Sequence, residues 1–307
     1  MGYTVSGLTN YIEVNKDVIL RDAILGSGMK GETIPMMRKQ LGVKTSERLN
    51  YLDVTPVLQA VEGCGFSAQG STVFSERDIT TAQAKVNDEW CIEDLLGKFT
   101  EYKVRIGADD QAMPFEAEIM DQIVKKINKE VEKQVWQGDT TATGRTDLIN
   151  GLLTLANGAD SASTITKVSA SGATAYERIL DTYMAIPEEI VDEAVIFVSP
   201  AIFRQYAQNL VAKNYFHYDG ENGELTELFI PGSDVKVRKT FGLTGSDYIY
   251  ATVPENMVYA TDFVNNKEEL KGWFSDDNDV YRMKIRFNFG VATLFPDAVI
   301  VNSVSAE

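Results

Sequence analysis

The chain has 307 residues, 44% of them hydrophobic, which is enough to build one large domain or two modest ones without a metal or disulfide framework. Its 29 basic and 45 acidic residues give a formal charge of −16, which repels phosphate and disfavours tight nucleic-acid binding. The single histidine excludes a histidine-based metal cluster, and Cys64 and Cys91 lack metal-ligand spacing. We expect neither a signal peptide nor a membrane-spanning helix, because no stretch approaches the roughly 20 apolar residues that a span requires.

Residues 1–60 are predicted to form short pieces without a core of their own. An apolar stretch from Asp17 to Leu25 ends at glycines, Pro35 interrupts the next stretch, and residues 38–52 favour a short helix. The first fifty residues carry a charge of +2, against −18 for the rest. We therefore expect an extended, mildly basic arm that lies across the acidic surface of a neighbour; a solvated surface with chance asymmetry is the alternative.

Residues 61–100 are predicted to form a polar β-ribbon. Ser71 to Ser75 and Ile79 to Ala82 are rich in β-forming residues, and Glu76-Arg77-Asp78 lies between them. The segment holds few large apolar residues, and a two-stranded ribbon of this size has little stability alone. The ribbon is therefore expected to need another surface to lie on.

Residues 101–147 hold the clearest predicted element, a helix from Pro114 to Gln137. Apolar side chains recur every four residues along it, at Phe115, Ile119, Ile123, Ile127, Val131 and Val135. Acidic residues come early in the helix and lysines later, as the helix dipole favours, and Gly138 ends it. At 1.5 Å per residue the helix spans about 36 Å, roughly twice the usual length. The pattern predicts a long amphipathic helix packed on a sheet, and it disfavours a coiled coil because the apolar step does not alternate between three and four.

Residues 148–265 alternate helical and strand patterns, which predicts an α/β or α+β domain around a central sheet. The helices are expected at Ala175 to Ile186 and Pro200 to Ala212, and the strands at Ala194 to Val198, Val235 to Val237, Tyr248 to Thr252 and Met257 to Ala260.

The tail, residues 266–307, is β-like. Apolar residues from Tyr281 to Phe289 alternate with Arg282, Lys284 and Arg286, which is the period of a half-buried strand, and Gly290 is expected to end it. The three basic residues share one face, which is either solvated or contacts phosphate or the acids of a neighbour.

No combination of residues points to catalysis. His217 would have to be the base of a serine hydrolase, but the chain has no Gly-x-Ser-x-Gly elbow, and the nearest exposed candidate nucleophile is Ser199. The acidic pairs Glu188-Glu189 and Asp276-Asp277 lack the ligand spacing of a calcium loop. We therefore predict no catalytic residue, no cofactor and no metal ligand. A soluble α+β enzyme that uses carboxylates is one alternative, because the pairing of such groups is spatial.

Four local motifs add to the order of these elements. The long helix closes on Val135-Trp136-Gln137-Gly138-Asp139, and Gly-Leu-Leu-Thr follows at 151–154. Val198-Ser199-Pro200 opens a helix, and Phe295-Pro296-Asp297-Ala298-Val299 lies near the end. Over about residues 60–307 the chain resembles major capsid proteins of tailed double-stranded DNA bacteriophages. The resemblance implies an α+β fold of the HK97 type: an N-terminal arm (1–60), an E-loop ribbon (61–100), a P-domain with a spine helix (101–147), an A-domain (148–265) and P-domain return strands (266–307).

The resemblance also implies a function, that of a structural subunit and not an enzyme. Such subunits assemble into hexamers and pentamers of an icosahedral capsid, which encloses DNA without sequence-specific binding. The implied partners are other copies of the chain, a portal and decoration proteins, with either a separate scaffolding protein or none, and the implied location is a virion assembled in the bacterial cytoplasm. An encapsulin-like compartment shell, which has the same fold, is the other alternative. Inter-subunit contacts are expected at Glu76, Arg77, Lys85, Arg38 and Lys39.

Overall fold

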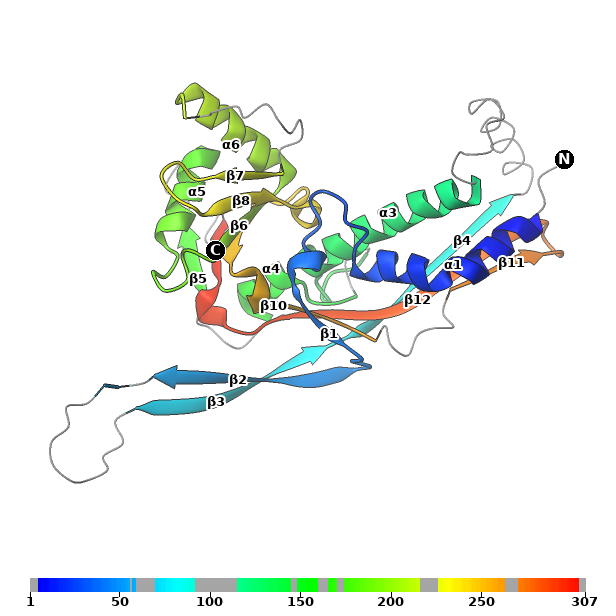
Figure 1. The fold of residues 1–307 in the computed structure, drawn as a ribbon, viewed down its shortest axis with the longest axis horizontal. Helices are drawn as coiled ribbons and strands as arrows, with labels where there is room; N and C mark the ends of the chain where they lie inside the picture. Colours follow the sequence, from blue (N-terminus) through cyan, green and yellow to red (C-terminus); the bar gives the residue numbers. More distant parts are fainter. Residues whose placement is uncertain are drawn as a thin grey trace.

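The computed structural model describes residues 5–55, 57–58, 70–91, 115–144, 148–159, 165–169, 174–215, 226–262 and 270–303. In these residues the chain has a mixed α+β fold with one five-stranded, one six-stranded and one two-stranded sheet. Figure 1 shows an elongated body with the six-stranded sheet and its helices at one end, and the two-stranded ribbon projecting from it.

The five-stranded sheet is built around one long strand, β12 (Val280–Thr293). Its other strands are β1 (Arg38–Leu41), β4 (Ala82–Cys91), β10 (Met257–Thr261) and β11 (Lys271–Ser275). β4, β10 and β11 run antiparallel to β12, and β1 pairs in parallel with β10 at the edge. A strand of 14 residues is long enough to hold three partners, so β12 is the axis of this part of the molecule.

The alternation predicted for the tail is confirmed in β12. Its apolar side chains Tyr281, Met283, Ile285, Phe287 and Phe289 are each at most 1% exposed, and the residues between them are half-buried.

Gly290 does not end the strand, contrary to the prediction. A Cβ atom at this position would lie 2.1 Å from the carbonyl oxygen of Thr80, so the glycine permits a close crossing of two backbone segments.

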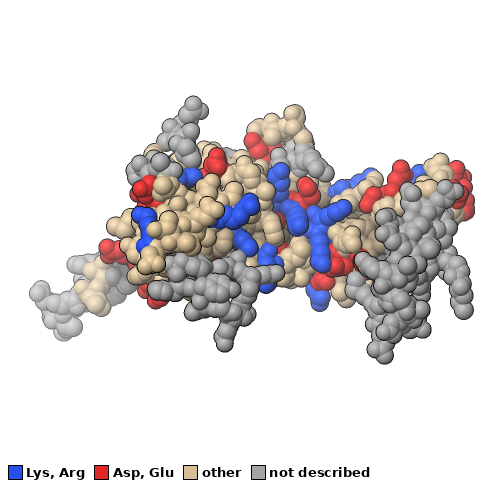
Figure 2. All heavy atoms as spheres, turned by 90° about the horizontal axis from the view of Figure 1, so that it is seen from above, with Lys and Arg blue, Asp and Glu red and all other residues tan. Residues whose placement is uncertain are grey.

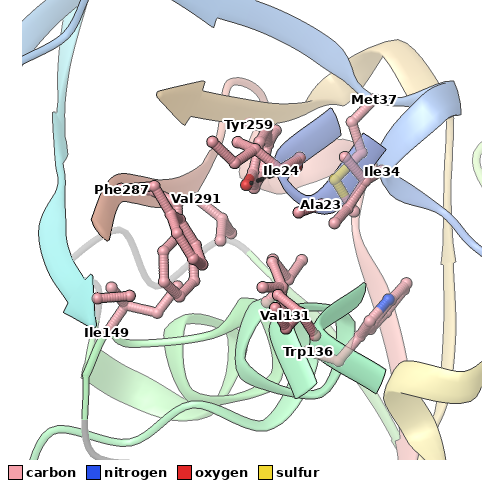
Figure 3. Close-up of a cluster of buried hydrophobic side chains, with 14 of the residues drawn as sticks. Ala23, Ile24, Ile34, Met37, Val131, Trp136, Ile149, Tyr259, Phe287 and Val291 are labelled. Carbon is pink, nitrogen blue, oxygen red and sulfur yellow. Dashed lines mark hydrogen bonds between the residues drawn. The ribbon is translucent and has the colours of Figure 1, made fainter. Parts of the chain in front are cut away.

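Helices α1 (Val5–Leu25) and α3 (Phe115–Gln137) cover the buried face of this sheet (Figure 1). The predicted long helix is confirmed, and its apolar stripe is buried at Met120, Val124, Ile127, Val131, Val135 and Trp136. Figure 3 shows Ile24 of α1, Val131 and Trp136 of α3, and Phe287 of β12 in one hydrophobic core. The hydroxyl of Tyr259, on β10, donates to the carbonyl of Ile24 over 3.0 Å and ties α1 to the sheet.

The prediction that residues 1–60 form short pieces without a core was wrong for residues 5–25. Six side chains of α1 are buried in the main core: Leu8, Ile12, Ile19, Leu20, Ala23 and Ile24. Val14 and Val18 are exposed, which blurs the amphipathic pattern that would have revealed the helix.

The two-stranded ribbon consists of β2 (Ser46–Thr55) and β3 (Ser71–Thr80). The helix predicted within residues 38–52 was wrong, because this segment forms β1 and most of β2. Ser71 to Ser75 and Ile79 to Ala82 were expected to be two separate strands. Ser71 to Thr80 form one continuous strand, β3, and Ala82 begins the next strand, β4. β4 does not belong to the ribbon, because it pairs with β12 in the five-stranded sheet.

The six-stranded sheet has the order β5 (Thr166–Ser169), β13 (Ile300–Ser303), β9 (Ile249–Thr252), β6 (Val195–Val198), β8 (Lys236–Lys239) and β7 (Glu227–Phe229). Helices α5 (Ala175–Met184) and α6 (Pro200–Ala212) pack on it and form a second core with it. The predicted helices and the strands near 195, 236 and 249 are confirmed. The strand near 257 is β10, which belongs to the five-stranded sheet rather than to this one.

Short helical turns connect these elements: η1 (Ile34–Met36), α4 (Leu152–Thr154), the π-helical η2 (Leu155–Ala159), η3 (Phe241–Leu243), η4 (Pro254–Asn256) and η5 (Pro296–Ala298). Among the helices of the described residues, none combines the length and apolar character needed to cross a membrane.

Candidate assembly surfaces

The root of the ribbon is fixed to the body. Leu49 of β2 and Ile79 of β3 are diagonal neighbours on one face of the ribbon. They are 6% and 1% exposed, and they are buried in a small core with residues of β10 and β12. Arg77 donates to the carbonyl of Thr293 over 2.9 Å, and the rings of Tyr51 and Phe295 lie edge to face 5.1 Å apart. The ribbon therefore leaves the body at a defined position.

The distal half of the ribbon exposes apolar side chains. Leu52 is directly opposite Phe74 in the strand register, and the two side chains share one face with Val54. Their exposed fractions are 48% for Leu52, 81% for Phe74 and 50% for Val54. An apolar strip on a projecting ribbon is a typical sign of a surface that another molecule covers.

The structure places the five predicted contact residues on three surfaces, and their role between subunits stays a prediction. Glu76 is on the ribbon and pairs with Arg48 over 2.8 Å, and Arg77 is at the ribbon root. Arg38 and Lys39 are exposed on the edge strand β1, and Lys85 is exposed on β4.

Basic groups gather on parts of this acidic chain. Figure 2 shows lysine and arginine side chains across the middle of the face seen from above. Helix α3 alone exposes four lysines, Lys125, Lys126, Lys129 and Lys133, and the ammonium group of Lys129 lies 5.3 Å from the centre of the Phe241 ring. The net charge of −16 therefore conceals local surfaces of the opposite sign.

A buried acid joins three distant segments of the chain. Glu132 of α3 accepts hydrogen bonds from the backbone N–H and the hydroxyl of Thr33 and, over 3.3 Å, from the hydroxyl of Thr240. The indole N–H of Trp136 donates to the Thr33 hydroxyl over 2.8 Å. Burial raises the pKa of Glu132 to about 7, with the hydrogen bonds from Thr33 opposing the shift. Sequence reasoning missed this site, because an acid beside an apolar stripe is usually solvated.

A Glu132→Gln variant should change how stability depends on pH. The pKa of Glu132 is raised in the folded state, so the folded protein binds more protons than the unfolded one between about pH 4.5 and 7. The wild type should therefore lose stability as the pH rises through this window, by about 3 kcal/mol for a 2.5-unit difference. Glutamine does not titrate, so the variant should lack this loss.

Urea unfolding at pH 5 and pH 8 checks this expectation, with Glu130→Gln as the control because Glu130 is exposed on the same helix. If wild type and Glu132→Gln keep the same difference in free energy at both pH values, the buried acid does not titrate as argued.

The described residues offer no support for a catalytic site. Ser199 is only 1% exposed, contrary to the sequence interpretation, because its side chain accepts from the N–H of Ile202 as the N-cap of α6. His217 and Cys64 lie outside the described residues. In the part of the chain that the structure covers, no three His, Cys, Asp or Glu side chains come together as a metal site would require.

The comparisons with known proteins define the fold. No protein-family model and no curated protein matches the sequence. Solved structures do match over nearly the whole chain, and they include a phage procapsid and a phage capsid, so this chain has the fold of a phage capsid protein and the resemblance inferred from the sequence is confirmed at the level of fold.

In particular, the chain is similar to a protein of the satellite phage P4 procapsid, with a TM-score of 0.61 and 10% identity over 99% of this chain and 91% of that one. It is also similar to the capsid of a native GTA particle (TM-score 0.58, 15% identity, 91% of both chains). A third match is to Gordonia phage Cozz (TM-score 0.55, 10% identity, 91% of this chain and 88% of that chain).

Proposed function

We propose that this protein is the structural subunit of an icosahedral phage capsid that encloses double-stranded DNA, and that it is not an enzyme. The observation that carries the proposal is the projecting β2–β3 ribbon, whose root is fixed to the body and whose tip exposes Leu52, Val54 and Phe74. The capsid fold of the matching structures supports it. In this proposal, copies of the chain form hexamers and pentamers, and each ribbon lies over the adjacent copy.

The proposed parts of the capsid fold follow the observed elements. The P-domain consists of α3 as the spine helix with β4, β11 and β12, and the A-domain is the six-stranded sheet with α5 and α6. We place the E-loop on β2 and β3, residues 46–80, because these two strands pair with each other over ten positions. The N-terminal arm then begins with α1, which packs on the spine helix of its own subunit.

The energetic argument for assembly is the cost of leaving the ribbon tip in water. Burying each large apolar side chain contributes about 1.5–3 kcal/mol, and three such residues lie on one face of the ribbon. Stable obligate interfaces commonly bury about 2,000–5,000 Å², and three apolar side chains cover only a small part of such an area. The proposal therefore requires contacts around the P-domain and A-domain as well. A scaffolding protein, a portal and decoration proteins are proposed as further partners.

Electron microscopy of the expressed protein tests the function. We expect closed, uniform shells or rings, formed alone or after co-expression with a scaffolding protein. Particles purified from infected or producing cells should contain double-stranded DNA. A protein that stays monomeric under all these conditions would refute the proposal, and shells that hold a cargo enzyme and no DNA would identify a cellular compartment instead.

A further inference from the structure

The strand register brings basic residues from three strands onto one face of the five-stranded sheet. On β12, Arg282, Lys284 and Arg286 point away from the core, as their buried neighbours show. Lys271 of β11 is directly opposite Lys284, and Lys85 of β4 is directly opposite Arg286. We call these five residues the cationic sheet face.

This face is open to solvent in the isolated chain. Lys85 and Lys271 are exposed and the three β12 residues are half-buried. The face is turned away from α1 and α3, which pack on the opposite side of the sheet. Glu89, which pairs with Arg282 over 3.5 Å, is the acid that the register places on the same face. Among the described residues of β4, β11 and β12, this face therefore carries five basic groups and one acid.

The arrangement costs stability in the isolated subunit. Like charges directly opposite each other on antiparallel strands destabilise a sheet, and Lys85 and Arg286 form such a pair on this face. An anionic partner seated on the face would remove that cost, so the register itself points to a ligand of negative charge.

We propose that the cationic sheet face binds an acidic surface on a second copy of this chain; the inference rests on the self-assembly proposed above. The net charge of −16 already includes the five cations, so the rest of each copy carries −21. Exposed acids of this kind lie, for example, in the turn between α5 and β6, at Glu188, Glu189, Asp192 and Glu193.

The composition of the face favours a protein partner over nucleic acid. Trp273 is directly opposite Arg282 and is 41% exposed, so an aromatic ring and a guanidinium group stand side by side on the surface. Arginine and tryptophan are the residue types enriched where proteins bind proteins. The overall negative charge of the chain opposes the approach of DNA.

A Lys85→Glu variant separates association from folding. The substitution replaces a like-charge pair with an opposite-charge pair beside Arg286, so the melting temperature of the unassembled subunit should rise by about 2 °C or stay unchanged. Association should weaken at least tenfold in concentration at 0.1 M NaCl, and the difference should shrink at 1 M NaCl because salt screens exposed charges. Lys167→Glu is the matched control, since Lys167 is exposed on β5 of the other sheet.

Sedimentation velocity measures association of any order, so the surface is tested even if closed shells do not form. Unchanged association of Lys85→Glu would overturn the inference and leave the proposed function standing, whereas absence of any association in the wild type, both alone and with a scaffolding protein, would overturn both. Binding of a 30-base-pair duplex, followed by fluorescence anisotropy, is the remaining readout. If Lys85→Glu loses duplex binding and keeps self-association, the occupant is nucleic acid and the inference is wrong.

Discussion

A protein that carries Leu52→Thr and Phe74→Thr together is expected to fold normally and to lose assembly. Both side chains are exposed on the ribbon, and they are directly opposite each other, so one contact should depend on both. Threonine keeps the preference for strand structure while it removes most of the apolar area. The loss of about 3 kcal/mol per ribbon contact should raise the concentration needed for assembly by more than 100-fold.

Sedimentation velocity and electron microscopy measure the assembly, and thermal unfolding of the unassembled subunit measures the fold. The matched control is Met184→Thr with Val211→Thr, which removes two apolar side chains of 80% and 60% exposure on α5 and α6. If the ribbon variant and this control assemble like the wild type, the exposed tip of the ribbon is not an interface and the main support for the proposed function is gone.

A Trp136→Ala substitution is expected to destabilise the subunit by about 3–5 kcal/mol, enough to leave much of it unfolded. Trp136 is fully buried, and its ring centre lies 5.3 Å from that of Phe197 and 5.2 Å from that of Tyr250. These two residues belong to β6 and β9, so the indole holds α3 against the six-stranded sheet. Its N–H also donates to Thr33 over 2.8 Å.

A Trp136→Phe variant separates the contribution of the ring packing from that of the hydrogen bond to Thr33. Phenylalanine keeps an aromatic ring in the core and removes the hydrogen bond to Thr33, so its cost should be about 1–2 kcal/mol. Urea unfolding followed by circular dichroism measures both variants. Equal costs for the alanine and phenylalanine variants would mean that the hydrogen bond, and not the packing between the two parts of the molecule, is what the tryptophan contributes.

The elements that local chemistry determines were predictable from the sequence. The helix at Pro200–Ala212 was located correctly because Pro200 suits its first turn. The long helix was found from its apolar period, and β12 from strict alternation. In each case the signal lies within the element itself, so no knowledge of distant contacts was needed.

Of the two ribbon strands only β3 was predicted as a strand, since the two strands are far enough apart in the sequence that no tight turn marks their pairing. β2 ends at Thr55 and its partner β3 begins at Ser71. The residues of β2 alternate weakly, because Leu52 and Val54 are exposed on one face of the outer half of the ribbon and Val73 of β3 is exposed on the other. Without one buried face, apolar and polar residues do not alternate along the segment, and it was mistaken for a helix.

The candidate surfaces, too, could be predicted where the signal lies within one strand and not where it depends on contacts between distant segments. The basic face of β12 was visible in the sequence at Arg282, Lys284 and Arg286. Lys85 and Lys271 join it only through strand register, which composition and spacing do not reveal. Similarly, Glu132 meets Thr33 and Thr240 across about a hundred residues on either side. Contacts of this range are created by the tertiary fold.

The junction between the ribbon and the body has a mechanical consequence. Thr81 is the single residue between β3 and β4, and its N–H is fixed to the carbonyl of Thr45 over 2.8 Å. A pull on the ribbon along β3 therefore passes directly into β4, which is paired with β12 over ten registered positions. These hydrogen bonds lie across the direction of pull and are loaded in shear, so they share the force instead of opening one after another. A shell built from such subunits would resist pressure from within through its backbone as well as through its side chains.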